Sequence, residues 1–343
     1  MLRDGVVDDV NGQSNTGKPP AQHDVFSLRE GETGILGRLR APNLRDESPI
    51  DRGYRYLRRA FDIDRCYQAT LSRTPDFMSR TEMPEEAFSS AIILDLLMAS
   101  RLSSRIKSRI TEYLGEYHEH GVFSYFMDTS LLPRDVDVTG LALSVLIKLG
   151  VVPMDVAHSA ASKVLQNVND TGVIHVYLPP RGEREGRYRI DPVPCANALY
   201  LAYLLGREGE ARPTEEYLID SLSPENAARP SAYYYYLTPD GLLYWASRLL
   251  EFEAFRRRYA HLIEDVLRAR IGSSDVPLEL AYRVIAANRL RIDDASEREA
   301  LRAAQNADGS WPASPMYKLG RSDVYVGSEA LVTAFALRAL DDQ

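Results

Sequence analysis

Two aspartates stand two residues apart in the segment PRDVDVTGLAL, which spans residues 133–143. Asp135 stands where a side chain can cap the amino end of the apolar helix that follows, since Asp is a favoured capping residue. Asp137 is not needed for that cap, and its valine neighbours predict a dry environment. Burial keeps a carboxyl group neutral, and a nearby carboxylate can share in its proton exchange. The pair therefore has the chemistry of a general acid and its companion.

An acid of this kind that protonates an alkene creates a carbocation, and aromatic faces stabilise positive charge without quenching it. The chain has 20 Tyr, 9 Phe and 2 Trp. The aromatic candidates for lining such a site are Tyr234, Tyr236, Tyr244, Trp245, Tyr317 and Tyr325. The tyrosines of the YYYY run fit an alternative role, which is to cover the core.

Two further polar groups have more than one interpretation. Thr139 fits a proton relay, and it equally fits a first-turn hydroxyl that satisfies the backbone. Arg187 lies in the charged segment PPRGEREGRYR (179–189), where an arginine fork could hold a diphosphate. Glutamates alternate with the arginines there, which favours a solvated loop.

Helical periodicity dominates from residue 49 onward, in segments of about ten to eighteen residues. Strand-like alternation is confined to short pieces such as GVIHVYL (172–178). The predicted fold class is therefore all-α. Residues 1–48 lack periodicity and are expected to form a flexible amino-terminal segment, and residues 49–343 are expected to form a single domain.

Three segments of the chain repeat one another: DVDVTGLAL (135–143), DPVPCANAL (191–199) and DVYVGSEAL (323–331). Each follows a glycine turn and begins with Asp, which predicts caps at Asp135, Asp191 and Asp323. The expected inner helices are 139–149, 195–205 and 327–339. Helix pairs of this kind stack into a solenoid or close into a toroid. The third position of the unit is Asp137, Val193 and Tyr325, so Asp137 differs from its counterparts.

The bulk composition excludes several classes of protein. The 343 residues carry a net charge of −8, which argues against nucleic-acid binding through a general positive field. Two cysteines make neither a disulfide framework nor a zinc set. The first residues contain no apolar core of a signal peptide, and no apolar run is long enough to span a membrane. The expected location is the cytoplasm.

The segment QNADGSW (305–311) resembles the Gln-x3-Gly-x-Trp repeat of squalene and terpene cyclases, through Gln305, Gly309 and Trp311. QNVNDTGVI (166–174) and HEHGVF (118–123) look like decayed copies. DVDVT resembles the Asp-x-Asp-Asp-Thr motif of class II terpene cyclases. Val138 departs from that motif, because it stands where the family has its last Asp.

The resemblance, which covers about residues 50–343, implies an (α/α) barrel of repeated helix pairs like the β domain of class II terpene cyclases. It also implies protonation of an alkene or epoxide followed by ring closure. By position, Asp137 matches the general acid, Asp135 the first Asp and Thr139 the Thr. Most class II cyclases pair this barrel with a second helical domain, for which this chain is short. Neither the Asp-Asp-x-x-Asp metal motif nor a prenyltransferase zinc set is present.

The sequence thus predicts a class II-like terpenoid cyclase acting on a linear polyprenyl substrate. A non-catalytic isoprenoid-binding or scaffold protein on the same barrel is the alternative, and a toroidal glycosidase with paired carboxylates is a third hypothesis. No metal site is expected from the residues. Mg²⁺ is expected only with a diphosphate substrate. The expected partners are a small isoprenoid and a second copy of the chain in a homodimer.

Overall fold

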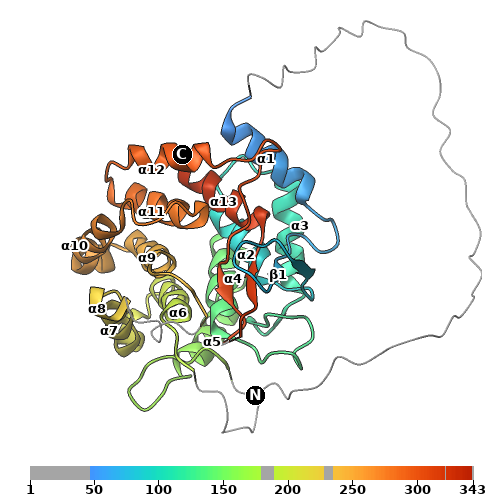
Figure 1. Cartoon of the computed structure of the whole chain (residues 1–343). Coiled ribbons are helices and arrows are strands. Elements are labelled where there is room, and N and C mark those ends of the chain that lie inside the picture. Colours follow the sequence, from blue (N-terminus) through green and yellow to red (C-terminus); the bar gives the residue numbers. More distant parts are fainter. Residues whose placement is uncertain (1–46, 179–188, 228–234, 321, 342–343) are drawn as a thin grey trace, which may run out of the picture. The chain divides into compact units, whose positions relative to one another are not determined.

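The structure is a computed structural model, which describes residues 47–178, 189–227, 235–320 and 322–341. Residues from Glu47 onward form one compact unit. Most of it is helical, as expected, and short strands form a minor part (Figure 1). The predicted limits of the flexible segment and of the domain stay predictions.

Six helices contact one another in cyclic order, and the last of them contacts the first. They are α2 (Phe88–Leu97), α4 (Val136–Lys148), α6 (Pro192–Leu204), α9 (Pro239–Arg248), α11 (Pro277–Leu290) and α13 (Glu329–Leu340). These helices are apolar on nearly all faces and almost wholly buried, which is typical of helices that other elements surround. We call them the central helices.

A second set of helices packs against the central ones. It comprises α1 (Pro49–Ala60), α3 (Ser104–Gly115), α5 (Met154–Leu165), α7 (Arg212–Ser221), α10 (Glu253–Arg270) and α12 (Ala295–Ala303). Each contacts one or two central helices, and α1 lies beside α13 (Figure 1). These helices are amphipathic. In α1, for example, Gly53, Tyr54 and Leu57 are buried while the basic residues of its last turn are not.

Short connecting elements complete the described chain. They are the 3₁₀ turns η1 (Glu208–Ala211) and η2 (Leu249–Glu251), the short helix α8 (Pro224–Ala227), and the strands β1 (Thr70–Ser72), β2 (Arg80–Glu82), β3 (His118–Glu119), β4 (Val122–Phe123), β5 (Tyr317–Lys318) and β6 (Tyr325–Gly327). The strands form an antiparallel sheet in the order β2-β1-β6-β5 and a β3–β4 pair. The predicted alternation at 172–178 yields isolated bridges rather than a strand.

The segments that precede the central helices pair with one another. Glu86 bridges Phe126, Asp135 bridges Tyr177, and Tyr236 bridges Tyr317. In the same way β1, ahead of α2, pairs with β6, ahead of α13. The amino ends of these central helices therefore gather at one edge of the helix cycle, which we call the amino rim. This rim holds the predicted acid pair.

The turn around Gly309 packs against α1, close to where α1 contacts α13. Gly309 has φ +98°, and a Cβ there would lie 2.4 Å from the carbonyl oxygen of Arg52, so only glycine fits. The amide of Gln305 donates to the carbonyls of Pro49 and Gly309. Trp311 is fully buried, and its indole N–H donates to the carbonyl of Leu301 at 2.6 Å. The motif residues are therefore structural, as expected for Trp311.

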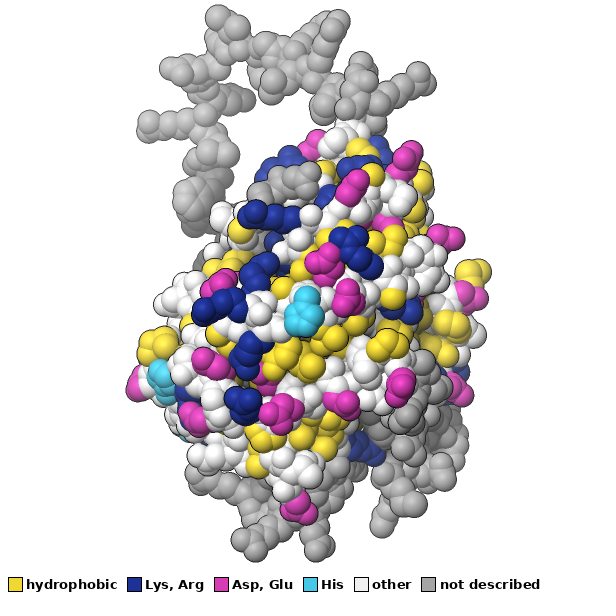
Figure 2. Space-filling view, turned by 90° about the vertical axis from the view of Figure 1, so that its left-hand side faces the viewer, with side chains coloured by type: hydrophobic (Ala, Val, Ile, Leu, Met, Phe, Trp, Pro, Cys, Tyr) yellow, Lys and Arg dark blue, Asp and Glu magenta, His cyan; other side chains and the backbone are white. Residues whose placement is uncertain are grey.

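The face in Figure 2 carries basic and acidic side chains interspersed, with small apolar areas between them. No helix in the described part of the chain has the length and apolarity required to cross a membrane.

Candidate active site

The first carboxyl group of the site is the cap of α4. The Oδ1 atom of Asp135 accepts a hydrogen bond from the amide of Val138 at 2.7 Å, which confirms the predicted cap. The side chain is buried. Burial, followed by the charge of Asp137, raises the pKa of Asp135 well above its usual value. The two carboxyl groups therefore oppose simultaneous ionisation.

Asp137 lies in the first turn of α4, and both of its carboxyl oxygens accept hydrogen bonds. Asn197 of α6 donates from Nδ2 to Oδ1 at 2.6 Å. The hydroxyl of Tyr236, which precedes α9, donates to Oδ2. The acid is thus held by residues from two other parts of the helix cycle.

The close approach of α4 and α6 makes the contact with Asn197 geometrically feasible. A Cβ on Gly140 would lie 2.7 Å from the backbone carbonyl carbon and oxygen of Asn197. A larger residue would therefore push the helices apart and lengthen the bond to Asp137. Gly140 follows the DVDVT motif directly, so the motif and its packing requirement are adjacent in the chain.

Asn197 is in turn fixed by a buried ion pair. Its Oδ1 accepts from Nη1 of Arg248, at the end of α9. The Nη2 atom of Arg248 lies 3.0 Å from Oδ2 of Asp95 in α2, and both side chains are nearly inaccessible. A guanidinium group can only donate, so the carbonyl oxygen of the Asn197 amide must face Arg248. Its NH₂ group must then face Asp137.

Burial raises the pKa of Asp137 to about 7, against an ordinary value of 3.8. The hydrogen bonds from Tyr236 and Asn197 lower this pKa, and the nearby Asp191 raises it. Asp191 itself caps α6, accepts from the amide of Val193 at 3.0 Å and has a pKa raised by burial to about 6. Three acidic side chains thus gather at the amino rim, and two side chains donate hydrogen bonds to Asp137.

A cluster of aromatic rings from α9, α2 and the segments before α9 and α13 includes Tyr236, which contacts the acid. The ring of Tyr236 lies 5.8 Å from that of Tyr317 and 6.4 Å from that of Trp245. Phe88 of α2 lies 6.3 Å from Trp245 and 6.0 Å from Tyr317. Tyr244 continues the cluster at 5.0 Å from Trp245. Four of the predicted aromatic residues therefore belong to one cluster, which contacts Asp137 through the hydroxyl of Tyr236.

Thr139 is tied to the backbone. Its hydroxyl donates to the carbonyl oxygen of Asp135 at 2.6 Å and accepts from the amide of Phe123 at 3.0 Å. The same tie recurs in the last unit, where the amide of Trp311 donates to the hydroxyl of Thr333 at 3.0 Å. The recurrence favours the backbone role of Thr139 over the relay role.

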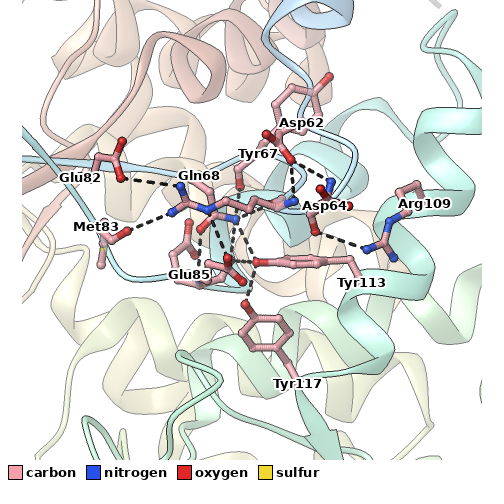
Figure 3. Close-up of polar contacts among 12 residues, drawn as sticks. Asp62, Asp64, Tyr67, Gln68, Glu82, Met83, Glu85, Arg109, Tyr113 and Tyr117 are labelled. Carbon is pink, nitrogen blue, oxygen red and sulfur yellow. Dashed lines mark hydrogen bonds and ion pairs between the residues drawn. The ribbon is translucent and has the colours of Figure 1, made fainter. Parts of the chain in front are cut away.

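A polar cluster at the start of α2 adds another buried acid that the sequence did not single out. The carboxyl of Glu86 is fully buried and accepts from the amide of Ser89 at 2.9 Å, and burial raises its pKa. The backbone of Glu86 is held by Gln68 and Tyr113. Tyr113 lies between Gln68 and Tyr117 (Figure 3). Its hydroxyl accepts a hydrogen bond from the Gln68 amide and shares another with the Tyr117 hydroxyl. This cluster fixes where α2 begins, and so where Phe88 lies.

Part of the chain is similar to known proteins. Residues 50–205 match the model of the sesquiterpene cyclase astC-like C-terminal domain. The chain is also 27% identical over 219 residues to drimenol cyclase drtB of Aspergillus calidoustus. These two matches make the chain similar to sesquiterpene cyclases over part of its length. The drtB match covers 62% of this chain and 39% of drtB, so it spans well under half of that curated relative.

Solved structures resemble this chain in fold. The type II terpene cyclase MstE from Scytonema matches with a TM-score of 0.63 at 13% identity, over 87% of this chain and 97% of MstE. An MstE variant solved with its substrate geranylgeranyl dihydroxybenzoate matches with a TM-score of 0.64 at 13% identity, over 87% and 96% of the two chains. A protein from Actinoplanes matches with a TM-score of 0.59 at 18% identity, over 85% and 98%.

The predicted register of the third repeat is wrong. The cap of α13 is Ser328, whose hydroxyl accepts from the amide of Leu331, and Asp323 is exposed and pairs with Lys318 at 3.2 Å. Tyr325 consequently lies in β6, not in a first helical turn like Asp137. The Lys318 ammonium lies 4.8 Å from its ring centre. The role of Tyr325 in substrate binding stays a prediction.

Two predicted substrate-binding residues, Tyr234 and Arg187, lie outside the described residues. Three others that bear on the acid were missed: Asn197, Arg248 and Asp95. Each is an amide or charged side chain within a mainly apolar run, in CANAL, WASRLL and IILDLL, and that pattern could have identified them. Among the described residues, no cluster of three or more His, Cys, Asp or Glu side chains is suited to a metal ion.

A pocket of about 790 Å³ lies near the amino rim, outside α4. Its lining includes Glu119, His120, Arg134, Lys163 and Leu178. Arg134 and Glu119 form an ion pair of 2.6 Å there. Because Arg134 directly precedes Asp135 in the chain, the pocket adjoins the segment that leads to the acid pair.

Proposed function

We propose that this chain is a class II-like terpenoid cyclase that protonates a linear polyprenyl substrate through Asp137. The observation that carries the proposal is the state of this carboxyl group. Burial holds its pKa near 7, so a large fraction is protonated at neutral pH, while two hydrogen-bond donors are already in place. These are the requirements for a general acid whose conjugate base must be stabilised at once.

The contacts of Asp137 favour one carboxyl oxygen for the acidic proton. The NH₂ group of Asn197 cannot accept a hydrogen bond, so Oδ1 of Asp137 keeps a lone pair toward it in both protonation states. The proton therefore resides on Oδ2, where the Tyr236 hydroxyl can turn to accept, or points away from both partners toward substrate. When the proton moves to an alkene carbon, Asn197 and Tyr236 both donate to the new carboxylate.

The carbocation formed at that carbon needs surroundings that do not trap it. The rings of Tyr236, Tyr317, Trp245 and Phe88 provide aromatic faces next to the acid. A cation over such a face is stabilised by about 0.5–2 kcal/mol. We infer that this cluster guides the cation, and that loss of a proton or addition of water ends the reaction.

The cyclic contact order of the central helices supports an (α/α) barrel, the architecture expected from the repeats. A polyprenyl chain attached to an acidic or diphosphate head fits this chemistry, and MstE is described with a prenylated dihydroxybenzoate as substrate. Mg²⁺ remains a prediction tied to a diphosphate substrate. A homodimer and a cytoplasmic location also remain predictions.

The test is incubation of the purified protein with farnesyl and geranylgeranyl diphosphates, squalene and a geranylgeranylated benzoate, with products read by mass spectrometry. In D₂O, a protonation-initiated reaction places one solvent deuterium in each product formed by proton loss. Asp137→Asn should fold and lose turnover by several orders of magnitude, whereas Asp155→Asn, an exposed control, should not. Cyclisation by Asp137→Asn at the wild-type rate would exclude Asp137 as the acid.

The alternative is an isoprenoid-binding protein without catalysis. It is favoured if the same substrates bind but none is converted by wild-type protein. A glycosidase would need two carboxyl groups free to face a sugar, and the Oδ1 atom of Asp135 is already engaged as a helix cap.

A further inference from the structure

Four arginines line one pocket at the carboxyl ends of α11 and α13. The pocket has a volume of about 440 Å³, and its lining includes Arg289, Arg291, Arg298, Arg338 and Asp341. We call it the arginine pocket. Because α13 starts at the amino rim and rises about 1.5 Å per residue, the pocket lies about 20 Å from the rim that holds Asp137.

The acidic side chains around this pocket either contact residues outside it or pair with one of its arginines. Arg298 pairs with Asp294 at 2.6 Å. Asp341 accepts from the hydroxyl of Tyr54 at 2.8 Å and lies 3.8 Å from Arg101. In the part of the chain that the structure describes, Arg289, Arg291 and Arg338 form no ion pair with a carboxylate. Among the described residues, three of the four arginines thus lack an acidic partner.

Helix ends explain only some of these arginines. The carboxyl end of a helix favours cations, because its last carbonyls are unpaired. Here Asn288 and Arg298 already donate to the carbonyl of Ala339, at 3.0 and 3.2 Å. Arg289 donates to the hydroxyl of Ser247 at 2.8 Å and sits 5.3 Å from the ring centre of Tyr244. Its burial and the repulsion from Arg248 and Arg338 lower its pKa.

The backbone at Arg291 is also unfavourable for an arginine. This residue ends α11 with φ 60° and ψ 40°, a left-handed conformation in which glycine is the usual residue. An L side chain is strained in that conformation. The chain nevertheless places a long cationic side chain at the pocket. Backbone strain of this kind is typical of residues that have a role in binding or catalysis.

We propose that the arginine pocket binds a phosphoryl anion, either free diphosphate or phosphate or the head group of a phosphorylated ligand. Guanidinium forks match phosphoryl oxygens in pairs, so several arginines around one cavity suit this chemistry better than a halide or a single carboxylate. Pockets of about 300–1,000 Å³ are the usual size for small ligands. The site does not depend on the proposed cyclase activity, because it lies at the other end of the helices from the acid.

The test is calorimetric titration of the intact protein with inorganic diphosphate at constant ionic strength. Arg338→Gln removes a charge that is only partly buried, and Arg291→Gly removes another while relieving the left-handed backbone. Each should weaken binding about tenfold or more without lowering the melting temperature. Arg302→Gln, on the exposed side of α12, is the matched control and should bind as wild type does.

Titration with geranylgeranyl diphosphate and with geranylgeraniol separates the two sources of the anion. A free anion predicts that inorganic diphosphate binds as tightly as the prenyl ester. A ligand head group predicts that the ester binds more tightly and that both variants weaken it. The proposal is overturned if diphosphate does not bind, or if the two variants and the control bind it equally. None of these readings requires turnover.

Discussion

The Oδ1 atom of Asp137 lies 2.6 Å from the Nδ2 atom of Asn197, and Arg248 leaves that amide a single orientation. The contact joins two consecutive central helices, α4 and α6. It means that the acid is oriented by a residue that is itself oriented by an ion pair. The strength of the acid is therefore set across four helices rather than within the DVDVT segment alone.

Replacing Asn197 by Asp should reduce turnover by about 100- to 1,000-fold, the usual cost of losing one donor to a developing anion. The new carboxylate can still accept from Arg248, so the fold should persist. It also repels the charged form of Asp137 and raises its pKa. The pH dependence of turnover should move upward, and ¹³C NMR of labelled aspartate should show the same shift. An unchanged pH profile in a folded variant would contradict the role of Asn197.

Arg248→Gln should destabilise the protein by about 3–5 kcal/mol, because it leaves Asp95 buried and unpaired. The double variant Asp95→Asn with Arg248→Gln removes both charges and should recover most of that loss in urea unfolding. We expect it to stay slower than wild type, since a glutamine amide no longer dictates the orientation of Asn197. Full activity in the stable double variant would show that the ion pair serves only the fold.

The raised pKa of Asp137 predicts how stability varies with pH. Its folded value is about 7 and its ordinary value is 3.8, so the native state binds the extra proton between these values. This stabilisation is complete below about pH 4 and is lost as the pH rises to 7, at up to about 1.4 kcal/mol per pH unit.

Relative to Asp137→Asn, wild-type protein should therefore lose unfolding free energy across that window and level off above it. Urea unfolding of both proteins at several pH values measures the difference. Turnover should likewise fall above about pH 7, where the acid loses its proton. Parallel stability curves for the two proteins would mean that Asp137 titrates near its ordinary value.

The corrected register of the third repeat predicts that two nearby substitutions change the unfolding free energy by different amounts. Ser328→Ala removes the cap of α13 and should cost about 0.5–2 kcal/mol of unfolding free energy. Asp323→Ala removes an exposed surface pair and should change stability by less than about 1 kcal/mol. Thermal melts of both variants decide the matter, and the reverse order would restore the register expected from sequence.

Sequence patterns predicted the features that depend on residues close together in the chain. The helices and the caps at Asp135 and Asp191 each depend on residues within one or two turns of the chain. The register of the third unit was missed because β6 replaces the first helical turn there. That strand pairs with β5 nearby and with β1, some 250 residues away in the chain, and no local pattern indicates the pairing with β1.

The site was predictable in part for the same reason. Asp137 stood out against its repeats, and the tyrosine and tryptophan candidates near α9 were visible as residue types. The contacts of Asn197, Arg248 and Asp95 come from three different helices, and their convergence depends on how the helices pack. Their isolation in apolar runs was a usable signal, but it does not indicate which of them meet.

The contacts between α13 and α2 also bear on how the chain folds as it is made. In synthesis α2 emerges about 240 residues before α13, the helix that completes the cycle of central helices. Until then, one side of α2 and one side of α11 lack their apolar neighbour, although both are built almost entirely of residues that end up buried. The edge of α2 therefore stays uncovered until α13 is made, whereas that of α11 waits only for the short stretch between α11 and α13. Protection of these edges is a requirement that the folded molecule no longer shows.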